Sequence, residues 1–435
     1  MQRRHFLNMK NNFVHWFRGS SPYIQAHRNK TFVINFGGEA LQDENFQNLI
    51  HDFALLTSLG IRLVLVHGIR PQIDARLQNL NHPARFHDGL RITDDVALRC
   101  VKEAAGFVRV EIEALLSMGL LNSPMANAEL KVASGNFVIA KPIGVIDGID
   151  YANTGAVRRI NSAAIHNQLA QHNLVLISPV GYSPSGDVFN LSAEQVATAV
   201  AIALNADKLI FLTEQSCLDE KGDLIAQLTT DELKHLPPAP LQRGVFQAAI
   251  ESCEAGISRV HLINRHIDGA LLQELFTRDG VGTLISTAPY ETCRSATLND
   301  IGGILELIKP LEQQGILAKR SREKIEMEIA DYFVIERDGL IIGCAALHLG
   351  EYAVLACLAV HSDYRGGARG QRLFIRALEK AKQSHVKKVF VLSTQTVQWF
   401  VERGFEPCEI ETLPDSLKAL YNPKRNSKIL FKNIE

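Results

Sequence analysis

Hydrophobic residues follow two different spacings along the first two thirds of the chain. Short apolar runs at Thr31–Phe36, Ile61–His67 and Val260–Asn264 have the length and the β-branched content of buried strands. Between the first two runs, one face of a predicted helix carries Phe46, Leu49, Ile50, Phe53 and Leu56. A strand, a helix and a strand of this length predict a βαβ unit in a parallel sheet.

The same alternation continues to about residue 285. We expect further strands at Phe137–Ala140, Val175–Ser178 and Leu209–Leu212, and further helices at Ala193–Leu204 and Gly269–Phe276. The pattern predicts an α/β domain over residues 21–285. Residues 286–293 lack periodicity and contain Pro289, so we expect a linker there.

The remaining residues, 294–435, predict a second domain with a different order of elements. The expected elements are a helix capped by Asp300, a helix at Arg322–Ala330, a hairpin of Tyr332–Arg337 and Leu340–Leu349 turning at Asp338-Gly339, an apolar strand at Val354–Val360, a helix opening at Gln371, a strand at Val389–Ser393 and a helix at Gln395–Arg403. Two helices, a meander and a strand–turn–helix therefore follow one another.

Composition narrows the class of protein. Of 435 residues, 46% are hydrophobic and 21% are charged, as in soluble globular proteins, and the net charge of −1 gives no electrostatic case for nucleic acid or an acidic membrane. The seven cysteines are scattered, and neither Cys-x-x-Cys nor His-Glu-x-x-His occurs, so no disulfide framework or zinc site is indicated. We expect a cytoplasmic protein without a membrane span or a metal.

The N-terminal segment is basic, because no Asp or Glu precedes Glu39. A transit peptide is one interpretation. Apolar residues also recur at helical spacing, at Met9, Phe13, Trp16 and Phe17. We favour an amphipathic helix over residues 1–20 that docks on a partner.

A glycine-rich turn, residues 365–370, lies between the apolar strand at 354–360 and the helix that follows. Backbone N–H groups at such a turn and the helix dipole together form an anion cradle, which Arg365 and Arg369 would strengthen. The turn resembles the acetyl-coenzyme A loop of the GNAT N-acetyltransferases, Arg/Gln-x-x-Gly-x-Gly/Ala, with Ala368 in place of the first glycine. The order of elements in this domain also resembles the GNAT fold. The resemblance implies that acetyl-CoA contacts Cys357, Leu358, Val360, Arg365, Gly366, Gly367, Ala368, Arg369 and Gly370.

The first domain resembles the amino-acid kinase family, and the N-acetylglutamate kinases most closely. The matching stretches are Phe36-Gly37-Gly38, His67–Ile73, Asp88–Asp94, Ser134-Gly135-Asn136 and Asp268–Leu272. Kinases of that family carry one Lys before the double glycine and a second on a later helix, where this chain has Asn35-Phe36 and Gly244–Gln247. Phosphoryl transfer depends on charge neutralisation, so we expect a kinase-like fold without kinase chemistry.

The two domains together resemble the bacterial two-domain N-acetylglutamate synthases, over essentially the whole chain. Further matching stretches are Leu311–Leu317, Arg320–Glu323, Ala356–Val360, Trp399–Phe405 and Lys424–Lys428. The resemblance implies transfer of the acetyl group of acetyl-CoA to the α-amine of L-glutamate, the first step of L-arginine biosynthesis. An arginine-sensing oligomer with weak or no acetyltransferase activity is the alternative, since Val354 and Ala368 depart from the family pattern. An N-acetylglutamate kinase is the third, which the missing lysines disfavour.

The chemistry of this transfer needs specific groups. Glutamate carries two carboxylates, which favour paired cations, and the resemblance places substrate contacts at Arg320, Arg425 and Ser427. Backbone N–H groups in the Cys357–Val360 segment would bind the thioester oxygen. Ser393 matches a family position proposed to protonate the leaving thiolate.

Two further catalytic candidates are less clear from the sequence. Cys357 suggests a mechanism through an acyl-cysteine intermediate. However, a Cys in an apolar strand is more often a buried residue with a raised pKa. A general base must also take a proton from the amine. Family members often have a Glu three residues before Cys357, where this chain has Val354. Glu351 is the nearest acid, and it could serve only if a bulge or turn shifts the strand register.

Regulation is implied by the same resemblance. Arginine-sensitive kinases of the family bind arginine between an N-terminal helix and the last helix of the domain, which here implies Tyr23, Glu274 and Gly280. Glu274 would pair with the guanidinium. We expect feedback inhibition by L-arginine in a homo-oligomer, expected to be a hexamer joined through the N-terminal helix.

Overall fold

A computed structural model of the chain describes residues 2–119, 124–237, 242–277, 280–289, 291–337, 339–365, 368–413, 418 and 421–434, with the backbone alone for 2–13, 15, 412 and 424. It divides into two compact units, Met1–Pro289 and Tyr290–Glu435. No helix in the described ranges is long and apolar enough to cross a membrane.

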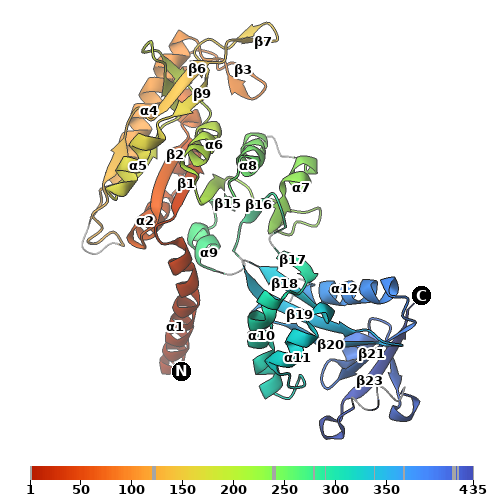
Figure 1. The fold of residues 1–435 in the computed structure, drawn as a ribbon. Helices are drawn as coiled ribbons and strands as arrows, with labels where there is room; N and C mark the ends of the chain where they lie inside the picture. The colour runs from red at the N-terminus through yellow and green to blue at the C-terminus, as the bar shows by residue number, and fades with distance from the viewer. Residues whose placement is uncertain are drawn as a thin grey trace. The chain divides into compact units, whose positions relative to one another are not determined.

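Unit 1 is an α/β domain (Figure 1). Its elements are α1 (Gln2–His27), β1 (Thr31–Phe36), η1 (Gly38–Gln42), α2 (Phe46–Ser58), β2 (Arg62–His67), α3 (Arg70–Asn79), β3 (Phe86–His87), β4 (Leu90–Arg91), α4 (Asp95–Leu116), β5 (Val132–Ser134), β6 (Val138–Pro142), β7 (Val145–Ile146), β8 (Ile149–Asp150), β9 (Gly155–Ile160), α5 (Ser162–Ala170), β10 (Leu174–Ile177), β11 (Val180–Tyr182), β12 (Val188–Asn190), α6 (Ala193–Leu204), β13 (Lys208–Thr213), β14 (Gln227–Thr229), α7 (Thr230–His235), α8 (Arg243–Glu254), β15 (Val260–Asn264), α9 (Ala270–Phe276) and β16 (Thr283–Ser286).

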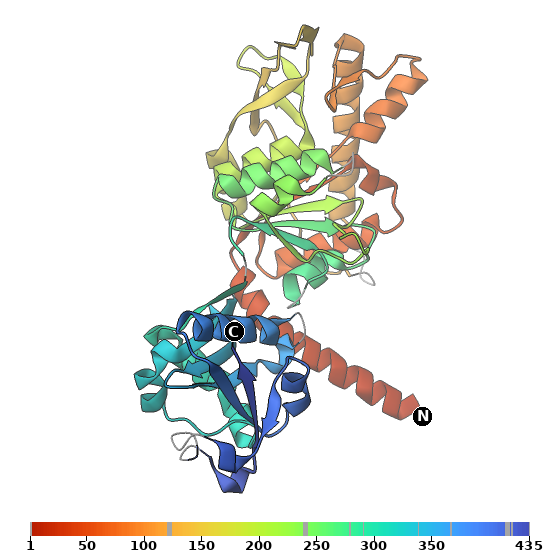
Figure 2. The same ribbon diagram turned by 90° about the vertical axis from the view of Figure 1, so that its right-hand side faces the viewer.

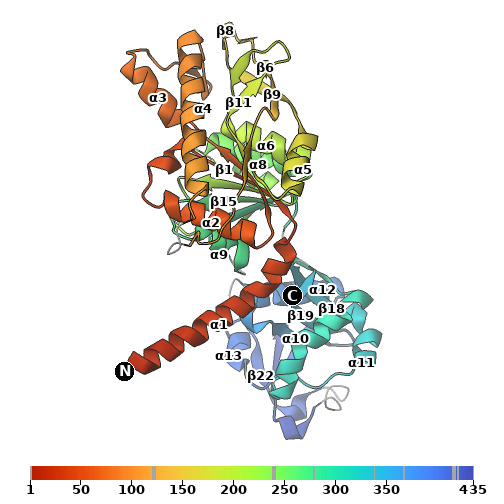
Figure 3. The same cartoon turned by 90° about the vertical axis from the view of Figure 1, so that its left-hand side faces the viewer.

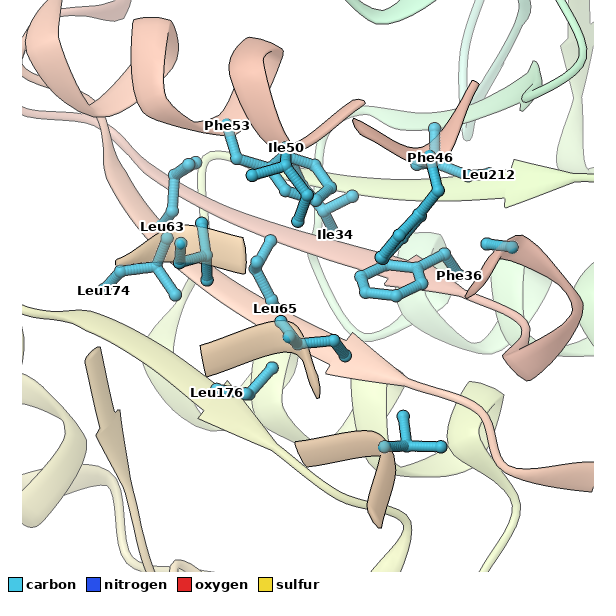
Figure 4. Packing of buried hydrophobic residues seen from close by; sticks show 14 of the residues in the cluster. Ile34, Phe36, Phe46, Ile50, Phe53, Leu63, Leu65, Leu174, Leu176 and Leu212 are labelled. Carbon is cyan, nitrogen blue, oxygen red and sulfur yellow. The ribbon is translucent and has the colours of Figure 1, made fainter. Parts of the chain in front are cut away.

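The central sheet of unit 1 has eight strands in the order β14-β16-β15-β13-β1-β2-β10-β5. All its neighbouring pairs are parallel except β15 with β16. Both faces are buried, because alternate residues of β1 face opposite cores: Ile34 packs with α2 and α9, and Val33 with α6 and α8. Figure 4 shows the first of these cores, in which Phe46, Ile50 and Phe53 cover the strands.

The strand predicted at 137–140 does not belong to the central sheet. β6, which covers most of the segment expected at 137–140, lies in a separate four-stranded sheet with the order β12-β11-β6-β9 and pairs with β9 in antiparallel fashion. Its burial alternates at Val138, Ile139 and Ala140 and ends exposed at Pro142, which suits a sheet with one solvated face.

The N-terminal helix is longer than expected. α1 runs to His27 and includes Pro22, so the helix does not stop at residue 20. Its last turns pack on α9, where His27 Nε2 lies 2.9 Å from the Leu275 carbonyl oxygen. Its first turns extend away from the rest of unit 1 (Figure 3), and Trp16 and Phe17 are 48% and 54% exposed. The side chains of Met9 and Phe13 lie outside those described.

Unit 2 is built on one seven-stranded sheet, in the order β17-β18-β19-β20-β21-β23-β22. Its elements are β17 (Glu291–Ser295), η2 (Leu298–Asp300), α10 (Ile301–Gln313), α11 (Arg322–Met327), η3 (Ile329–Asp331), β18 (Tyr332–Arg337), β19 (Leu340–His348), β20 (Ala353–Val360), η4 (Ser362–Tyr364), α12 (Arg369–Gln383), β21 (Lys388–Ser393), α13 (Val397–Val401), β22 (Glu406–Cys408), η5 (Ile410–Thr412), η6 (Pro423–Arg425) and β23 (Lys428–Asn433). One face of the sheet packs on α12 (Figure 2) and the other on α10 and α11.

Three local expectations differ from the structure of unit 2. Residues 291–293 of the expected linker begin β17. Asp300 does not cap α10 with its side chain; its Oδ2 instead accepts the Thr297 N–H at 2.7 Å in a capping box, while Arg294 pairs with the same carboxylate. The second helix ends at Met327, and a 3₁₀ turn continues to Asp331. The β18–β19 hairpin forms as expected, although Asp338 lies outside the described residues.

Candidate active site and regulatory site

Two neighbouring parallel strands of unit 2 diverge. β20 and β21 pair only at Ala353, Val354 and Leu355, although β20 continues to Val360 and β21 to Ser393. The ends of the two strands therefore form a wedge with unpaired backbone edges. An extended ligand with amide groups can hydrogen-bond to such edges as an added strand does.

A β-bulge lies beside this wedge. On β19, Cys344 faces Ala359 and Ala346 faces Ala356, so Cys357 and Leu358 together oppose only Ala345. Cys357 takes φ 53°, which is rare for a residue with a side chain. A bulge leaves its extra residue outside the ladder, so backbone N–H groups here are placed to meet a carbonyl oxygen in the wedge.

The glycine-rich turn leads into α12, as predicted. Ala368 is the N-cap and takes the left-handed conformation with φ 57°, so it adopts the geometry for which glycine is favoured. No acidic residue occupies the first turn of this 15-residue helix, so its free N–H groups remain suited to an anion. Arg365 is exposed, and Gly366 and Gly367 lie outside the described residues.

The Arg369 side chain forms an ion pair with a residue of β17. Its Nε donates to Glu291 Oε2 at 3.0 Å, so its side chain faces β17 instead of an open turn. Arg372 and Arg337 also contact the Glu291 carboxylate, at 3.3 and 3.4 Å. Three guanidinium groups around one carboxylate leave the start of α12 with an excess of positive charge, which suits phosphate groups.

The predicted substrate residues come together at the open end of β21 and β23. Arg425 donates from Nη2 to the Ile316 carbonyl oxygen at 2.8 Å, which brings it to the loop that leads to Arg320. Thr394, next to Ser393, contacts the same carbonyl at 3.4 Å. Ser393 pairs with Lys428 across the sheet, which places the buried Ser427 nearby.

Ser393 is also held by the turn that follows it. Its Oγ accepts the Thr396 N–H at 3.0 Å and lies 2.9 Å from the Thr396 hydroxyl. When the Thr396 hydroxyl donates in this pair, the Ser393 hydroxyl proton is free to be given to another group. Ser393 is only 8% exposed, so it points away from bulk water.

Cys357 is buried but differs from expectation in its ionisation. The neighbouring Cys344 thiol lowers the pKa of Cys357, burial opposes this, and the Arg320 guanidinium lowers it further. The expected rise from burial is therefore outweighed. The Arg320 guanidinium donates from Nη1 to the Ala318 carbonyl oxygen at 2.9 Å, and its charge acts on Cys357 and Tyr332.

Glu351 lies apart from Cys357 and Arg320. It is exposed in the turn before β20, six residues from Cys357, or on the order of 20 Å along an extended chain. The bulge falls after Val354, so it does not change the register between Glu351 and Val354. Glu312 is a carboxylate nearer to the bulge, but its Oε1 accepts the Arg320 N–H at 2.9 Å.

Two of the predicted regulatory residues, Glu274 and Gly280, lie together in unit 1. Glu274 of α9 accepts the N–H groups of Val281 and Gly282, each at 2.8 Å, and its carboxylate fills the space beside Gly280, which takes φ 63°. Tyr23 of α1 packs against the adjoining core. Glu274 is 6% exposed in its side chain and already has a partner in His261, at 2.7 Å.

A row of three buried side chains, Lys208, His261 and Glu274, ends at this carboxylate. The Lys208 ammonium lies 3.2 Å from His261 Nε2 and can only donate, so Nε2 accepts and the Nδ1–H donates to Glu274. Burial and the Lys208 charge lower the pKa of His261 to about 4. Although burial would raise the pKa of Glu274, the hydrogen bonds from His261 and the two amides lower it to about 2.

The glycine turn of unit 1 is closed by its neighbours. A Cβ on Gly68 would lie 2.8 Å from Gly38 N, so the two glycine loops pack directly on each other. Gln72 Nε2 donates to the Gly38 carbonyl at 2.7 Å. Asn35, which replaces the family lysine, is 4% exposed and donates to the Val66 carbonyl. The two glycine loops therefore leave no room for a side chain between them, and a neutral amide stands where the kinase resemblance implies a lysine.

Comparison with known proteins fits both units. The amino acid kinase family model matches residues 30–264, and an acetyltransferase (GNAT) domain model matches residues 328–407. An amino-acid acetyltransferase of Azotobacter vinelandii is 51% identical over 97% of this chain and 99% of its own length, and that of Escherichia coli K12 is 48% identical over 98% and 99%. This chain belongs to the amino-acid acetyltransferases.

A solved structure supports the family assignment. The N-acetylglutamate synthase of Neisseria gonorrhoeae, complexed with coenzyme A and L-arginine, aligns with a TM-score of 0.86 and 37% identity over 97% of this chain and 99% of its own. The predicted fold and the predicted enzyme class are thereby confirmed. As an amino-acid acetyltransferase with a GNAT domain, the protein uses acetyl-CoA as its acetyl donor.

The structure of this acetyltransferase shows contacts of the candidate residues that the sequence did not reveal. Glu291 organises three arginines, and Lys208 and His261 position Glu274. The sequence signal for His261 is a polar residue inside an apolar run, Val260-His261-Leu262, whereas Lys208 follows Asp207 at the start of its run and gives no such signal. Among the described residues, no group of three or more His, Cys, Asp or Glu side chains is placed to hold a metal ion.

Proposed function

We propose that this acetyltransferase transfers the acetyl group of acetyl-CoA to the α-amine of L-glutamate, giving N-acetyl-L-glutamate and CoA, as the first step of L-arginine biosynthesis in the cytoplasm. The observation that carries the proposal is that Arg425 donates to the Ile316 carbonyl oxygen, four residues before Arg320, whose charge acts on Cys357. Two carboxylates on one substrate need two such cations. The solved synthase of Neisseria gonorrhoeae has also been crystallised with coenzyme A and N-acetyl-glutamate, which supports this choice.

Other residues take supporting roles in the proposed reaction. Acetyl-CoA supplies an activated acetyl thioester. The turn at 365–370 and the start of α12 hold its phosphates, and the bulge at Cys357 and Leu358 polarises the carbonyl group. Ser393 gives its proton to the departing thiolate, and Ser427 orients the substrate beside Arg425.

L-Arginine is the proposed feedback inhibitor, bound by Tyr23, Glu274 and Gly280. Glu274 carries a negative charge whose oxygens already accept three hydrogen bonds, so arginine must share the carboxylate with His261 or replace it. Exposed Trp16 and Phe17 on α1 suit contact with a second copy of the chain. We propose a homo-oligomer, a hexamer, whose arrangement arginine changes.

The substrate proposal is tested by release of CoA thiol with acetyl-CoA and L-glutamate. Arg320→Ala and Arg425→Ala should each raise the KM for glutamate by about a hundredfold, since an unpaired substrate carboxylate costs about 3 kcal/mol, with little change for acetyl-CoA. Arg322→Ala is the matched control, because Arg322 is exposed at the start of α11, two residues after Arg320. L-Glutamine should be a poor substrate. An unchanged glutamate KM in both site variants would contradict the assignment.

The regulatory proposal separates this enzyme from an arginine-sensing oligomer with little activity. Millimolar L-arginine should slow turnover of the full chain, and Glu274→Gln should remove the response while uninhibited turnover persists. Deleting residues 1–20 should disperse the oligomer, as seen by light scattering. Activity and subunit number that both ignore arginine would refute regulation, but would leave the acetyltransferase assignment intact.

A further inference from the structure

The proposed reaction lacks an assigned proton acceptor. The α-amine of glutamate is mostly protonated near neutral pH, so a nearby group must remove a proton before the nitrogen can attack. Val354 is apolar, and Glu351 is exposed in the turn before β20. The inference below rests on the proposed function and identifies the group that accepts this proton.

His348 is the last residue of β19, on the face of the sheet that packs on α10 and α11. It pairs directly with Val354 of β20. Cys344 and Ala346 of the same strand face the core under α10 and α11, so alternation places His348 on that face with Cys357. Its side chain is 30% exposed, which gives it access both to the sheet face and to solvent.

The two ring nitrogens of His348 face two carboxylates. Nδ1 lies 2.9 Å from Asp331 Oδ2, and a carboxylate can only accept, so Nδ1 carries the proton and Nε2 has a free lone pair. Nε2 lies 4.0 Å from Glu328 Oε2, too far for a hydrogen bond. Glu328 Oε2 is buried and has no hydrogen-bond partner among the described residues.

His348 Nε2 and Glu328 Oε2 are both hydrogen-bond acceptors, and they face each other. This arrangement favours binding of a proton at Nε2. A proton on Nε2 would turn the Glu328 contact into an N–H···O interaction and leave the imidazolium between two negative charges. The Asp331 carboxylate therefore holds the imidazole ring in the orientation that leaves Nε2 free to accept a proton, as a general base requires.

A third unpartnered group lies between His348 and the bulge. Tyr332 Oη is buried and has no hydrogen-bond partner in the described part of the chain. Tyr332 pairs with Ala346, which pairs with Ala356 beside Cys357, and the tyrosine side chain interacts with the Cys357 thiol at the bulge. Buried polar atoms are nearly always hydrogen-bonded, so these atoms indicate positions for bridging water.

We propose that His348 is the general base of the acetyl transfer, receiving the proton of the substrate ammonium group through water held by Tyr332. The free amine then forms a C–N bond with the acetyl carbon as the C–S bond breaks. The second amine proton goes to the departing thiolate, and His348 releases the first to solvent. Asp331 and Tyr332 are positioning residues.

The test compares His348→Asn, which keeps an amide donor toward Asp331, with His348→Ala. Both should lower kcat about a hundredfold or more, with the KM values for acetyl-CoA and glutamate nearly unchanged. Added imidazole should restore part of the activity of His348→Ala and none of His348→Asn, whose side chain fills the site. Tyr332→Phe and Asp331→Asn should lower kcat less, each by about tenfold.

His385→Asn is the control, since His385 is exposed in the turn after α12 and its φ of 55° suits asparagine. It should retain full activity without any response to imidazole. Coenzyme A binding by calorimetry confirms that each variant is folded. A folded His348→Asn that keeps its kcat within twofold overturns the assignment of His348 alone. If the wild type releases no CoA with L-glutamate, both this assignment and the proposed function fail.

Discussion

Each unit has a glycine-rich turn between a strand and the helix that follows it, but the surroundings of the two turns differ. In unit 1, Gly38 packs against Gly68, and Gln72 binds the turn's carbonyl. In unit 2, Ala368 starts a helix whose first turn has no acid and whose base carries excess positive charge. A strand–glycine–helix pattern therefore supplies only a possible cradle. Neighbouring side chains decide whether it stays open to a ligand.

The largest expected difference between the units is in acid. Burial lowers the pKa of His27, His67 and His261 in unit 1 to about 4 each. Their folded pKa lies below the unfolded value of about 6.5, so the stability they contribute is complete above pH 6.5 and is lost as the pH falls toward 4. Each contributes up to about 3 kcal/mol.

Calorimetry between pH 7 and 4.5 should therefore show the unfolding transition of unit 1 falling more steeply than that of unit 2. His67→Asn should flatten the decline, because asparagine can still bind Ser178, which His67 Nε2 contacts at 2.8 Å, but takes up no proton. If the unfolding temperatures of both units fell equally with pH in the wild type, the expected difference between the units would be refuted.

Glu291→Gln tests how the positive turn of unit 2 is held together. Its side chain is 12% exposed and contacts three arginines, so removing its charge should destabilise unit 2 by about 3 kcal/mol. Denaturant unfolding measures the change. Glu379→Gln, which breaks only the exposed pair with Arg376, should change stability by less than about 1 kcal/mol. Equal effects of the two variants would refute a structural role for Glu291.

Gly68→Ala tests whether the turn of unit 1 is closed. The new Cβ would meet backbone atoms at 2.8 and 3.0 Å, so unit 1 should lose about 2 kcal/mol of stability. Gly244→Ala places a Cβ in open space on α8 and should be neutral or slightly stabilising. Thermal unfolding distinguishes them. An open phosphate cradle would instead tolerate Gly68→Ala as well as Gly244→Ala.

The smallest expected effect is at the turn of unit 2. Ala368 takes φ 57°, which costs an L-residue about 1 kcal/mol that glycine avoids. Ala368→Gly should therefore raise the stability of unit 2 by about 0.5 kcal/mol after the added freedom of the unfolded chain is counted. Coenzyme A affinity should change little. A lower melting temperature would show that the methyl group makes a stabilising contact.

Most of the fold followed from the sequence because its signals are local. The apolar runs of β1, β2, β13 and β15 are continuous, since both faces of that sheet are buried. The extent of α1 did not follow, because Pro22 suggests an end to a helix that in fact continues to His27. The second sheet of unit 1 did not follow either, since strand pairing depends on distant partners.

The sites were predictable in part for the same reason. Motif residues such as Arg425 and Ser393 lie together as expected from their resemblance to a known pattern. The contacts of Glu291 with Arg369 and Arg372 of α12 join residues that lie 78 and 81 positions apart in the sequence. No local sequence pattern predicts such contacts. The bulge at Cys357 was hidden too, because an apolar run shows no alternation whose interruption could reveal an extra residue.

That extra residue also sets the phase of β20. Ala353 and Leu355 pack against α12 before the bulge, and Leu358 and Val360 pack there after it, although the spacing from 355 to 358 is odd. Deleting that residue would let β20 run as a regular strand, with Leu358 and Val360 still facing α12. The two faces of the strand would keep their partners, but the backbone groups that border the wedge would be lost. A one-residue deletion here would therefore separate the packing of the core, which does not need the bulge, from the geometry of the wedge, which does.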